Sequence, residues 1–113
     1  MRFLVMVKST PESENAPPSE AVLTEMSKFN EELLQTGRIV LAEGLVASSE
    51  GARVWFDGDA EPQVTDGPFT ETKELVAGFW VLNGESLEDI VELMKRAPNP
   101  DKQDGIIEIR QIG

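Results

Sequence analysis

Four apolar segments with strand character and only two amphipathic helical segments constrain the fold of this 113-residue chain most strongly. The segments at residues 3–7 and 75–82 are apolar throughout, which is typical of strands buried on both faces, and residues 39–42 and 106–112 add two more strands. Two helices can cover only one face of a four-stranded sheet. The other face therefore needs a second cover, and we expect face-to-face dimerisation.

The two helical segments have clear ends. Ser19 is a typical N-cap for the first helix and Gly37 a typical C-cap, while Ser86 caps the second, which stops before Pro98. The periodicity predicts that the first helix buries a stripe made of Val22, Met26, Phe29 and Leu33, widened by Leu23 and Leu34. The second is expected to bury Leu87, Ile90, Val91, Met94 and Ala97. Residues 11–19, with three prolines, are expected to form a loop.

A hairpin interrupts the alternation of strands and helices. Residues 53–56 and 63–65 can pair across the turn signal Asp57-Gly58. The resulting order, β-α-β-(ββ)-β-α-β, predicts an α+β fold of the ferredoxin-like split βαβ type with an inserted β-hairpin. We find no linker, so residues 1–113 are expected to form one domain, with apolar side chains of the first, second and fourth core strands on the uncovered sheet face.

Composition excludes several classes of function. A formal net charge of -11 with scattered Lys and Arg argues against nucleic-acid and anionic-membrane partners. The chain has no Cys and no His, so thiol, Ser-His-Asp and zinc-thiolate chemistry cannot be assembled. It contains no calcium-loop spacing, phosphate loop or dinucleotide fingerprint, so we expect no metal and no cofactor. The absence of a signal segment and of a spanning apolar run predicts a cytoplasmic protein.

The stretch from Asp66 to Glu74 combines a sharp bend, an aromatic anchor and clustered charges. Gly67 tolerates unusual backbone angles and Pro68 fixes its own, so the chain bends before Phe69. Burial of Phe69 would stabilise the loop by roughly 1.5 to 3 kcal/mol. Lys73 is the only cation between Val54 and Met94, in acidic surroundings. We therefore expect this stretch to form one wall of a binding site.

The same residues carry a family resemblance. Asp66-Gly67-Pro68-Phe69, followed by Glu71, Lys73, Glu74 and Gly78-Phe79, resembles the signature of the DGPF branch of the YCII-related proteins, which are small bacterial proteins of mostly unassigned function. The likeness extends over nearly the whole chain. It implies the fold of the dimeric α+β barrel, with a cleft in each subunit between the sheet and the surrounding loops.

The resemblance leaves two functions open. Members of the DGPF branch often accompany extracytoplasmic-function sigma factors, which implies a small-molecule-binding, sensing module that forms a homodimer. The wider relatives of the barrel imply instead a cofactor-independent enzyme of isomerase or dehydrochlorinase (lyase) type. YCII-related proteins outside this branch have a His and Asp pair regarded as catalytic. This chain has no His, so that pair cannot be carried over.

Seven residues are candidates for the site, each with a structural alternative. Under the enzyme hypothesis, Asp66 or Glu43 is the base and Lys73 stabilises an oxyanion. Asp66 could instead cap its turn, Lys73 could pair with a neighbouring carboxylate, and Glu43 could make a structural hydrogen bond. The candidates for ligand binding are Phe69, Glu71, Arg53 and Trp55. An exposed strand pair would explain Arg53 and Trp55 equally well.

Overall fold

The computed structural model describes residues 1–70 and 74–113, which form an α+β fold with a four-stranded antiparallel sheet, three helices and a separate hairpin. The helices are α1 (Pro11–Glu14), α2 (Glu20–Gln35) and α3 (Leu87–Met94), with a short 3₁₀ turn at Ser48–Glu50. The sheet contains β1 (Arg2–Ser9), β2 (Ile39–Gly44), β5 (Leu75–Asn83) and β6 (Ile107–Gln111). The hairpin contains β3 (Ala52–Trp55) and β4 (Gln63–Asp66).

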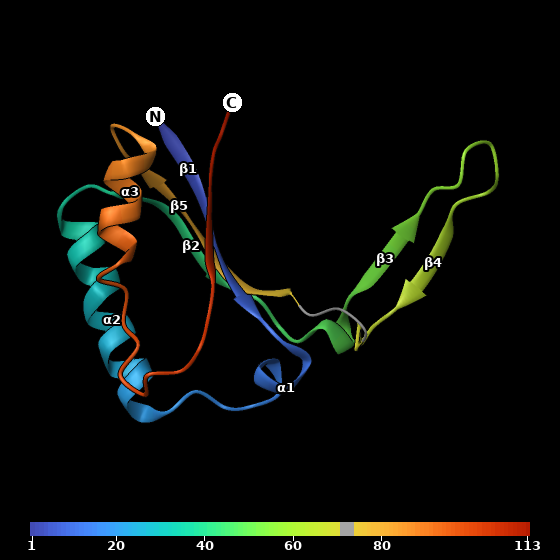
Figure 1. Cartoon of the computed structure of the whole chain (residues 1–113), viewed down its shortest axis with the longest axis horizontal. Helices are drawn as coiled ribbons and strands as arrows, with labels where there is room; N and C mark the ends of the chain where they lie inside the picture. Colours follow the sequence, from blue (N-terminus) through green and yellow to red (C-terminus); the bar gives the residue numbers. More distant parts are fainter. Residues whose placement is uncertain (71–73) are drawn as a thin grey trace.

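The strand order of the sheet is β2-β5-β1-β6, and every neighbouring pair is antiparallel. The two apolar segments predicted to be buried, β1 and β5, are therefore the two central strands. Val5 lies opposite Trp80 on one side and opposite Ile109 on the other. Helices α2 and α3 lie together on one side of the sheet (Figure 1). The predicted coverage of a single face by two helices is confirmed.

The core lies between the central strands and the two helices. Phe3 and Val5 of β1 and Trp80 and Leu82 of β5 alternate toward the helices and are buried. From the helices, the buried contacts come from Phe29, Leu33, Ile90, Leu93 and Met94. The Phe29 and Trp80 rings meet edge to face with centroids 6.1 Å apart. The Trp80 indole N–H donates a 2.8 Å hydrogen bond to Asn30 Oδ1, so its polar atom is satisfied inside the core.

Several details of the helix predictions are wrong. Leu34 is 65% exposed, and Leu23 and Leu87 are also exposed, because a helix resting on a sheet buries a narrower stripe than the sequence suggested. Leu93 is buried but was not predicted. Residues 11–14 form a short helix inside the expected loop. Thr10 caps it and Pro11 occupies the first turn, which is a favourable start for a helix.

The sheet face opposite the helices carries a partly exposed apolar surface, which we call the open face. Its apolar side chains alternate with the core residues and come from three strands: Leu4 and Met6 of β1, Phe79 and Val81 of β5, and Leu41 of β2. The expected apolar contribution of the last strand is wrong, since Glu108 and Arg110 of β6 occupy that face and Lys8 reaches Glu108 at 3.6 Å. The open face is therefore apolar with a charged edge.

Residues 52–66 form the predicted hairpin, which projects from the body on the side of the sheet opposite α2 and α3 (Figure 1). We call this hairpin the arm. The radius of gyration of the chain is 16.0 Å, compared with about 13 Å for a compact domain of this length. The arm carries large exposed side chains, including Phe56 at 79% and Trp55 at 52% exposure. Among residues 1–70 and 74–113, the single chain therefore provides no cover for the open face or for the outer part of the arm.

Candidate functional site

A cavity of about 360 Å³ lies where the arm joins the body, and we call it the joint cavity. In the described part of the chain, five separate segments build its wall: Glu14 of α1, the stretch after β2 with the 3₁₀ turn, the base of β3, Phe69 of the bend, and the start of β5. Its apolar lining comes from Leu45, Val46, Ala47, Phe69, Leu75 and Val76, and its polar lining from Glu14, Ser48, Glu50, Arg53 and Glu74. This mixture is typical of a small-molecule site.

The bend at residues 66–69 forms one wall of this cavity. Phe69 is only 8% exposed, so the aromatic anchor predicted from the sequence is confirmed. The Gly67 N–H donates a 2.9 Å hydrogen bond to the Gly51 carbonyl, and the Gly67–Pro68 peptide bond is cis. A Cβ atom at Gly67 would lie 1.7 Å from the Ser48 carbonyl oxygen. Glycine is therefore required at residue 67 because the backbone of the 3₁₀ turn lies against it.

A polar chain of hydrogen bonds ties α1, the 3₁₀ turn and the bend together, and we call it the Glu14–Ser48–Phe69 clip. The Glu14 carboxylate accepts one hydrogen bond from the Ser48 N–H at 3.0 Å and another from the Ser48 hydroxyl at 2.5 Å. The Ser48 Oγ atom in turn accepts a hydrogen bond from the Phe69 N–H at 3.3 Å. Hydrogen bonds to a charged group are stronger than neutral ones, so the clip holds the bend in place.

Arg53 closes the side of the cavity that belongs to the arm. Its guanidinium carbon lies 3.9 Å from the centre of the Phe69 ring, which is a cation–π contact. Such contacts contribute about 0.5–1 kcal/mol when exposed and more when water is excluded. Phe69 is thus held by the clip through its backbone and by Arg53 through its ring. The base of the arm and the bend therefore form one unit.

The charges around the joint cavity are unequal. Among the described residues, three carboxylates, Glu14, Glu50 and Glu74, line it beside the guanidinium of Arg53. In the described part of the chain, no three acidic side chains are grouped closely enough to hold a metal ion.

A large pKa shift occurs outside the joint cavity, at Asp89 near the start of α3. The pKa of Asp89 is lowered to about 2, mainly by hydrogen bonds from Arg38 and then by one from the Glu85 N–H.

A second cavity of about 260 Å³ lies between α2 and the sheet. Met26 and Asn30 of α2 face Glu43 and Gly44 of β2 across it, and β1 and β5 complete the wall with Val7, Ala77, Gly78, Phe79 and Trp80. The predicted close approach at Gly78 is confirmed, since a Cβ there would lie 2.9 Å from the Glu43 carbonyl oxygen. Asn30 is bonded to Trp80, and although Glu43 lines this cavity, its register opposite Phe79 places its exposed side chain on the open face.

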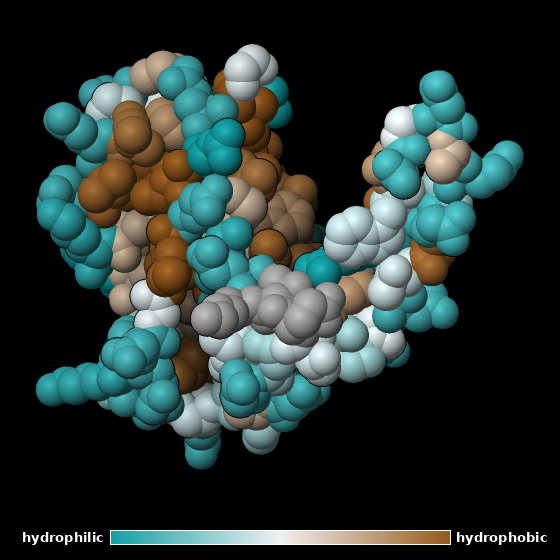
Figure 2. Space-filling model, turned by 45° about the vertical axis from the view of Figure 1, so that its right-hand side comes forward, coloured by the Kyte–Doolittle hydropathy of each residue, from teal (hydrophilic) through white to brown (hydrophobic). Residues whose placement is uncertain are grey.

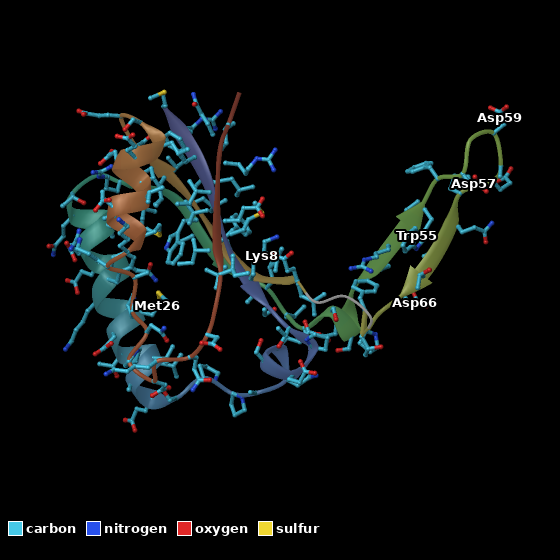
Figure 3. The ribbon with its side chains drawn as sticks, in the orientation of Figure 1. Lys8, Met26, Trp55, Asp57, Asp59 and Asp66 are labelled. Atoms are coloured by element: carbon cyan, nitrogen blue, oxygen red, sulfur yellow. The ribbon has the colours of Figure 1, made fainter. Side chains whose placement is uncertain are left out.

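The predicted site residues lie in different places. Phe69 and Arg53 line the joint cavity, and Glu43 lines the second cavity. Trp55 and Asp66 lie on the arm, where both are exposed and neither lines a cavity (Figure 3). Glu71 and Lys73 lie outside the described residues. The structure thus brings together two of the ligand-binding candidates and separates Glu43 from Asp66.

Sequence reasoning missed Glu14 and Ser48, which join three segments of the cavity wall. Glu14 lies in the segment expected to be a loop, and the start signal of Thr10 and Pro11 could have revealed its short helix. Ser48 follows an apolar segment and precedes polar residues, and nothing in its local pattern distinguishes it from a turn residue. Its role depends on a carboxylate 34 residues away in the sequence.

Comparison with known sequences finds a family and a relative that are similar to this chain. The model of the YCII-related domain matches residues 1–113. The chain is also 27% identical over 93 residues to "Uncharacterized protein R00369" of Rhizobium meliloti (strain 1021). The aligned region covers 82% of this chain and 74% of that protein. No helix in the described ranges is long and apolar enough to cross a membrane.

Proposed function

This chain belongs to the YCII-related family, and on that premise we propose that it is a small-molecule-binding module that works as a homodimer. The observation that carries the proposal is the joint cavity, whose apolar lining and convergent polar groups surround the bend at residues 66–69. Its volume of about 360 Å³ suits a ligand the size of a small aromatic metabolite. We assign the chain to the DGPF branch on the sequence Asp66-Gly67-Pro68-Phe69.

Surface area supports the dimer. The single chain exposes 8011 Å², whereas a compact monomer of its mass exposes about 6,100 Å². The excess is about 1,900 Å² per chain, or about 3,800 Å² for two chains, which is in the range that a permanent homodimer buries in total. The arm, which stands away from the body in Figure 2, adds to this exposed surface. We propose that two open faces pack together, as in a dimeric α+β barrel built from ferredoxin-like subunits.

The alternative of an acid–base enzyme receives less support from the described residues. It requires Asp66 or Glu43 to act with Lys73 in one cavity. Asp66 lines neither cavity, and Glu43 lines a cavity separate from the 66–69 bend. The polar groups that do converge on the bend are already linked in the Glu14–Ser48–Phe69 clip, where they hold a wall in place. This arrangement favours binding, and a sensing role would suit it.

The test is a fragment screen by thermal shift that includes indole-3-acetate and tryptamine, two compounds with the same ring and opposite charges. A fragment at a hundred times its dissociation constant should stabilise the protein by about 2.7 kcal/mol. Amide NMR shifts should then locate the bound fragment at residues 45–51 and 75–76 of the joint cavity. Comparing the two indoles would show whether the three carboxylates or Arg53 decide the charge of the ligand.

A blocking variant provides the control. Val46 lines the joint cavity and is exposed, so Val46→Trp should fill the cavity without disturbing the core. Leu34→Trp places the same side chain on an exposed position of α2, remote from the cavity, and should leave binding unchanged. Fragments that bind Val46→Trp as tightly as the parent, or that shift amides elsewhere only, would contradict the proposal.

A further inference from the structure

The arm is a two-stranded ribbon whose outer part has no cover among the described residues of the single chain. Strands β3 and β4 pair with each other and form a sheet of their own. An isolated two-stranded hairpin is only marginally stable in water and needs a third strand or a packed surface. Yet the arm presents large apolar side chains, namely Val54, Trp55, Phe56 and Val64, all exposed. Such residues stabilise a ribbon only when something covers them.

The position of the arm restricts what that cover is. The arm stands on the side of the sheet opposite α2 and α3, which is the side of the open face (Figure 1). A wide gap separates its outer part from the body (Figure 2). Trp55 lies on the part of the arm that stands clear of the body (Figure 3). A second copy seated on the open face would fill this gap and would lie against the arm.

Charge complementarity points to the same occupant. The arm carries four carboxylates, Asp57, Asp59, Glu61 and Asp66, against the single cation Arg53. The open face carries three cations, Arg2, Lys8 and Arg110, against the two carboxylates Glu43 and Glu108. The arm therefore has a formal charge of -3, from one cation minus four carboxylates, and the open face +1, from three minus two. In a chain of net charge -11, the open face thus has a small positive excess, although Lys8 and Arg110 both pair with Glu108, and it is the surface that an acidic arm would meet.

We propose that in the dimer each arm is clasped against the body of the second copy, with its acidic tip beside the cations at the edge of that copy's open face. This rests on the homodimer proposed above and adds the element that locks it. The base of the arm also supplies Arg53 to the joint cavity. A partner that immobilises the arm therefore also fixes Arg53 over Phe69 and completes the ligand site.

The two tryptophans make the test possible on the unmodified chain. Trp80 is 4% exposed and Trp55 is 52% exposed, so a single chain has one buried and one accessible fluorophore. We would measure acrylamide quenching and, on the same samples, the mass by light scattering. Acrylamide should find no accessible tryptophan in the dimer, whereas about half of the emission should be accessible in the single chain. Trp55→Phe is the control, because it leaves only Trp80 and should give the same low quenching at every protein concentration.

A second measurement reports on the whole arm, including the side that carries Val54 and Val64. Hydrogen exchange of the arm amides at residues 52–66 should be at least tenfold slower in the dimer than in Met6→Lys, which places a charge on the open face and should dissociate the copies. Leu34→Lys puts the same charge on the exposed side of α2 and should keep the arm protected. Added salt should weaken the protection, because opposite charges hold the acidic tip.

The outcomes separate the two proposals. A dimer with slow arm exchange supports the clasp, and if Trp55 stays quenchable the covered side is that of Val54 and Val64. A dimer in which Trp55 is quenched freely and the arm amides exchange as in Met6→Lys overturns the clasp and leaves the dimer standing. If the measured mass is that of one chain at all concentrations, both the homodimer and the clasp are overturned. The arm would then be covered by a partner of a different kind.

Discussion

The body and the arm are built from the same kind of β-structure, but they differ in what covers it. In the body, Val5 and Trp80 pair across antiparallel strands and are buried under α2 and α3. In the arm, Val54 and Val64 pair in the same way and are exposed. Strand pairing therefore depends on the local alternation of side chains and on a turn, whereas the stability of the paired strands depends on the layer that packs against them. The described residues of the single chain provide that layer for one sheet face and not for the outer part of the arm.

The largest contrast should come from truncating one apolar side chain in each region. Leu82 in β5 is fully buried, so Leu82→Ala should lower the free energy of unfolding by about 2–5 kcal/mol. Val64→Ala in the arm, measured at nanomolar concentration on the single chain, should cost less than about 0.5 kcal/mol. Denaturant titrations of both variants give the two values. Equal costs in dilute solution would mean that the arm is already packed within its own chain.

The connection between body and arm is tested at Gly67. Gly67→Ala places a methyl group 1.7 Å from the Ser48 carbonyl oxygen, so the bend must move, at a cost of about 1–3 kcal/mol or more. Gly44→Ala is the matched control, since a Cβ there meets nothing within 4 Å. Amide NMR spectra should change at residues 48–53 and at Phe69 in the first variant only. A spectrum of Gly67→Ala like that of the parent would contradict the close contact.

The clip should matter less than the bend but more than any surface charge. Glu14→Gln keeps the shape of the side chain and removes its charge, which weakens both hydrogen bonds to Ser48 and should cost about 1–3 kcal/mol. Glu12→Gln, an exposed neighbour in the same short helix, should change stability by less than about 0.5 kcal/mol. Thermal melts compare the two variants. If they melt together, the clip does not hold the bend.

The smallest effect concerns acid and the body alone. The pKa of Asp89 is lowered to about 2, mainly by its hydrogen bonds with Arg38 at 2.6 and 2.9 Å, whereas its unfolded value is 3.8. A lowered pKa stabilises the fold above pH 4, and that contribution disappears as the pH falls from about 4 through about 2. Partial exposure of the pair limits it to about 1 kcal/mol.

Asp89→Asn should therefore be less stable than the parent at pH 6 and should approach it at pH 2. Glu88→Gln, at an exposed neighbouring position, should show the parent's pH dependence. Melting temperatures across this range provide the measurement. A parent and an Asp89→Asn variant that differ equally at both pH values would exclude the ion pair as the cause. Because the Arg38–Asp89 pair lies in the body, its loss at low pH should leave the fluorescence emission of Trp55 in the arm unchanged.

Much of the body was predictable from the sequence. The apolar runs of β1 and β5, the caps Ser19 and Ser86 and the turn at Asp57-Gly58 each act locally, and the structure has these elements where they were expected. The width of the buried helical stripe was not predictable, because Leu33 and Leu34 are both apolar and only contact with the sheet distinguishes them. Local pattern determines an element, and packing determines which of its faces is buried.

The candidate site was predictable only in part. Phe69 was identified because a large aromatic after a bend can anchor it by burial, and Arg53 because it shares one side of the predicted hairpin with Trp55. Both Phe69 and Arg53 line the joint cavity. Glu14 and Ser48 were missed because their importance comes from meeting in space across 34 residues. Asp66 was placed beside the ligand by its position in the sequence, yet the arm carries its exposed side chain outside both cavities.

Sedimentation equilibrium of the unmodified chain tests most directly the claim that a second copy covers the open face and the arm. The account predicts a species of twice 12.4 kDa at micromolar concentration, dissociated by Met6→Lys and unaffected by Leu34→Lys. A mass of 12.4 kDa throughout the micromolar range would contradict it, because the exposed apolar surface would then have no cover of its own kind.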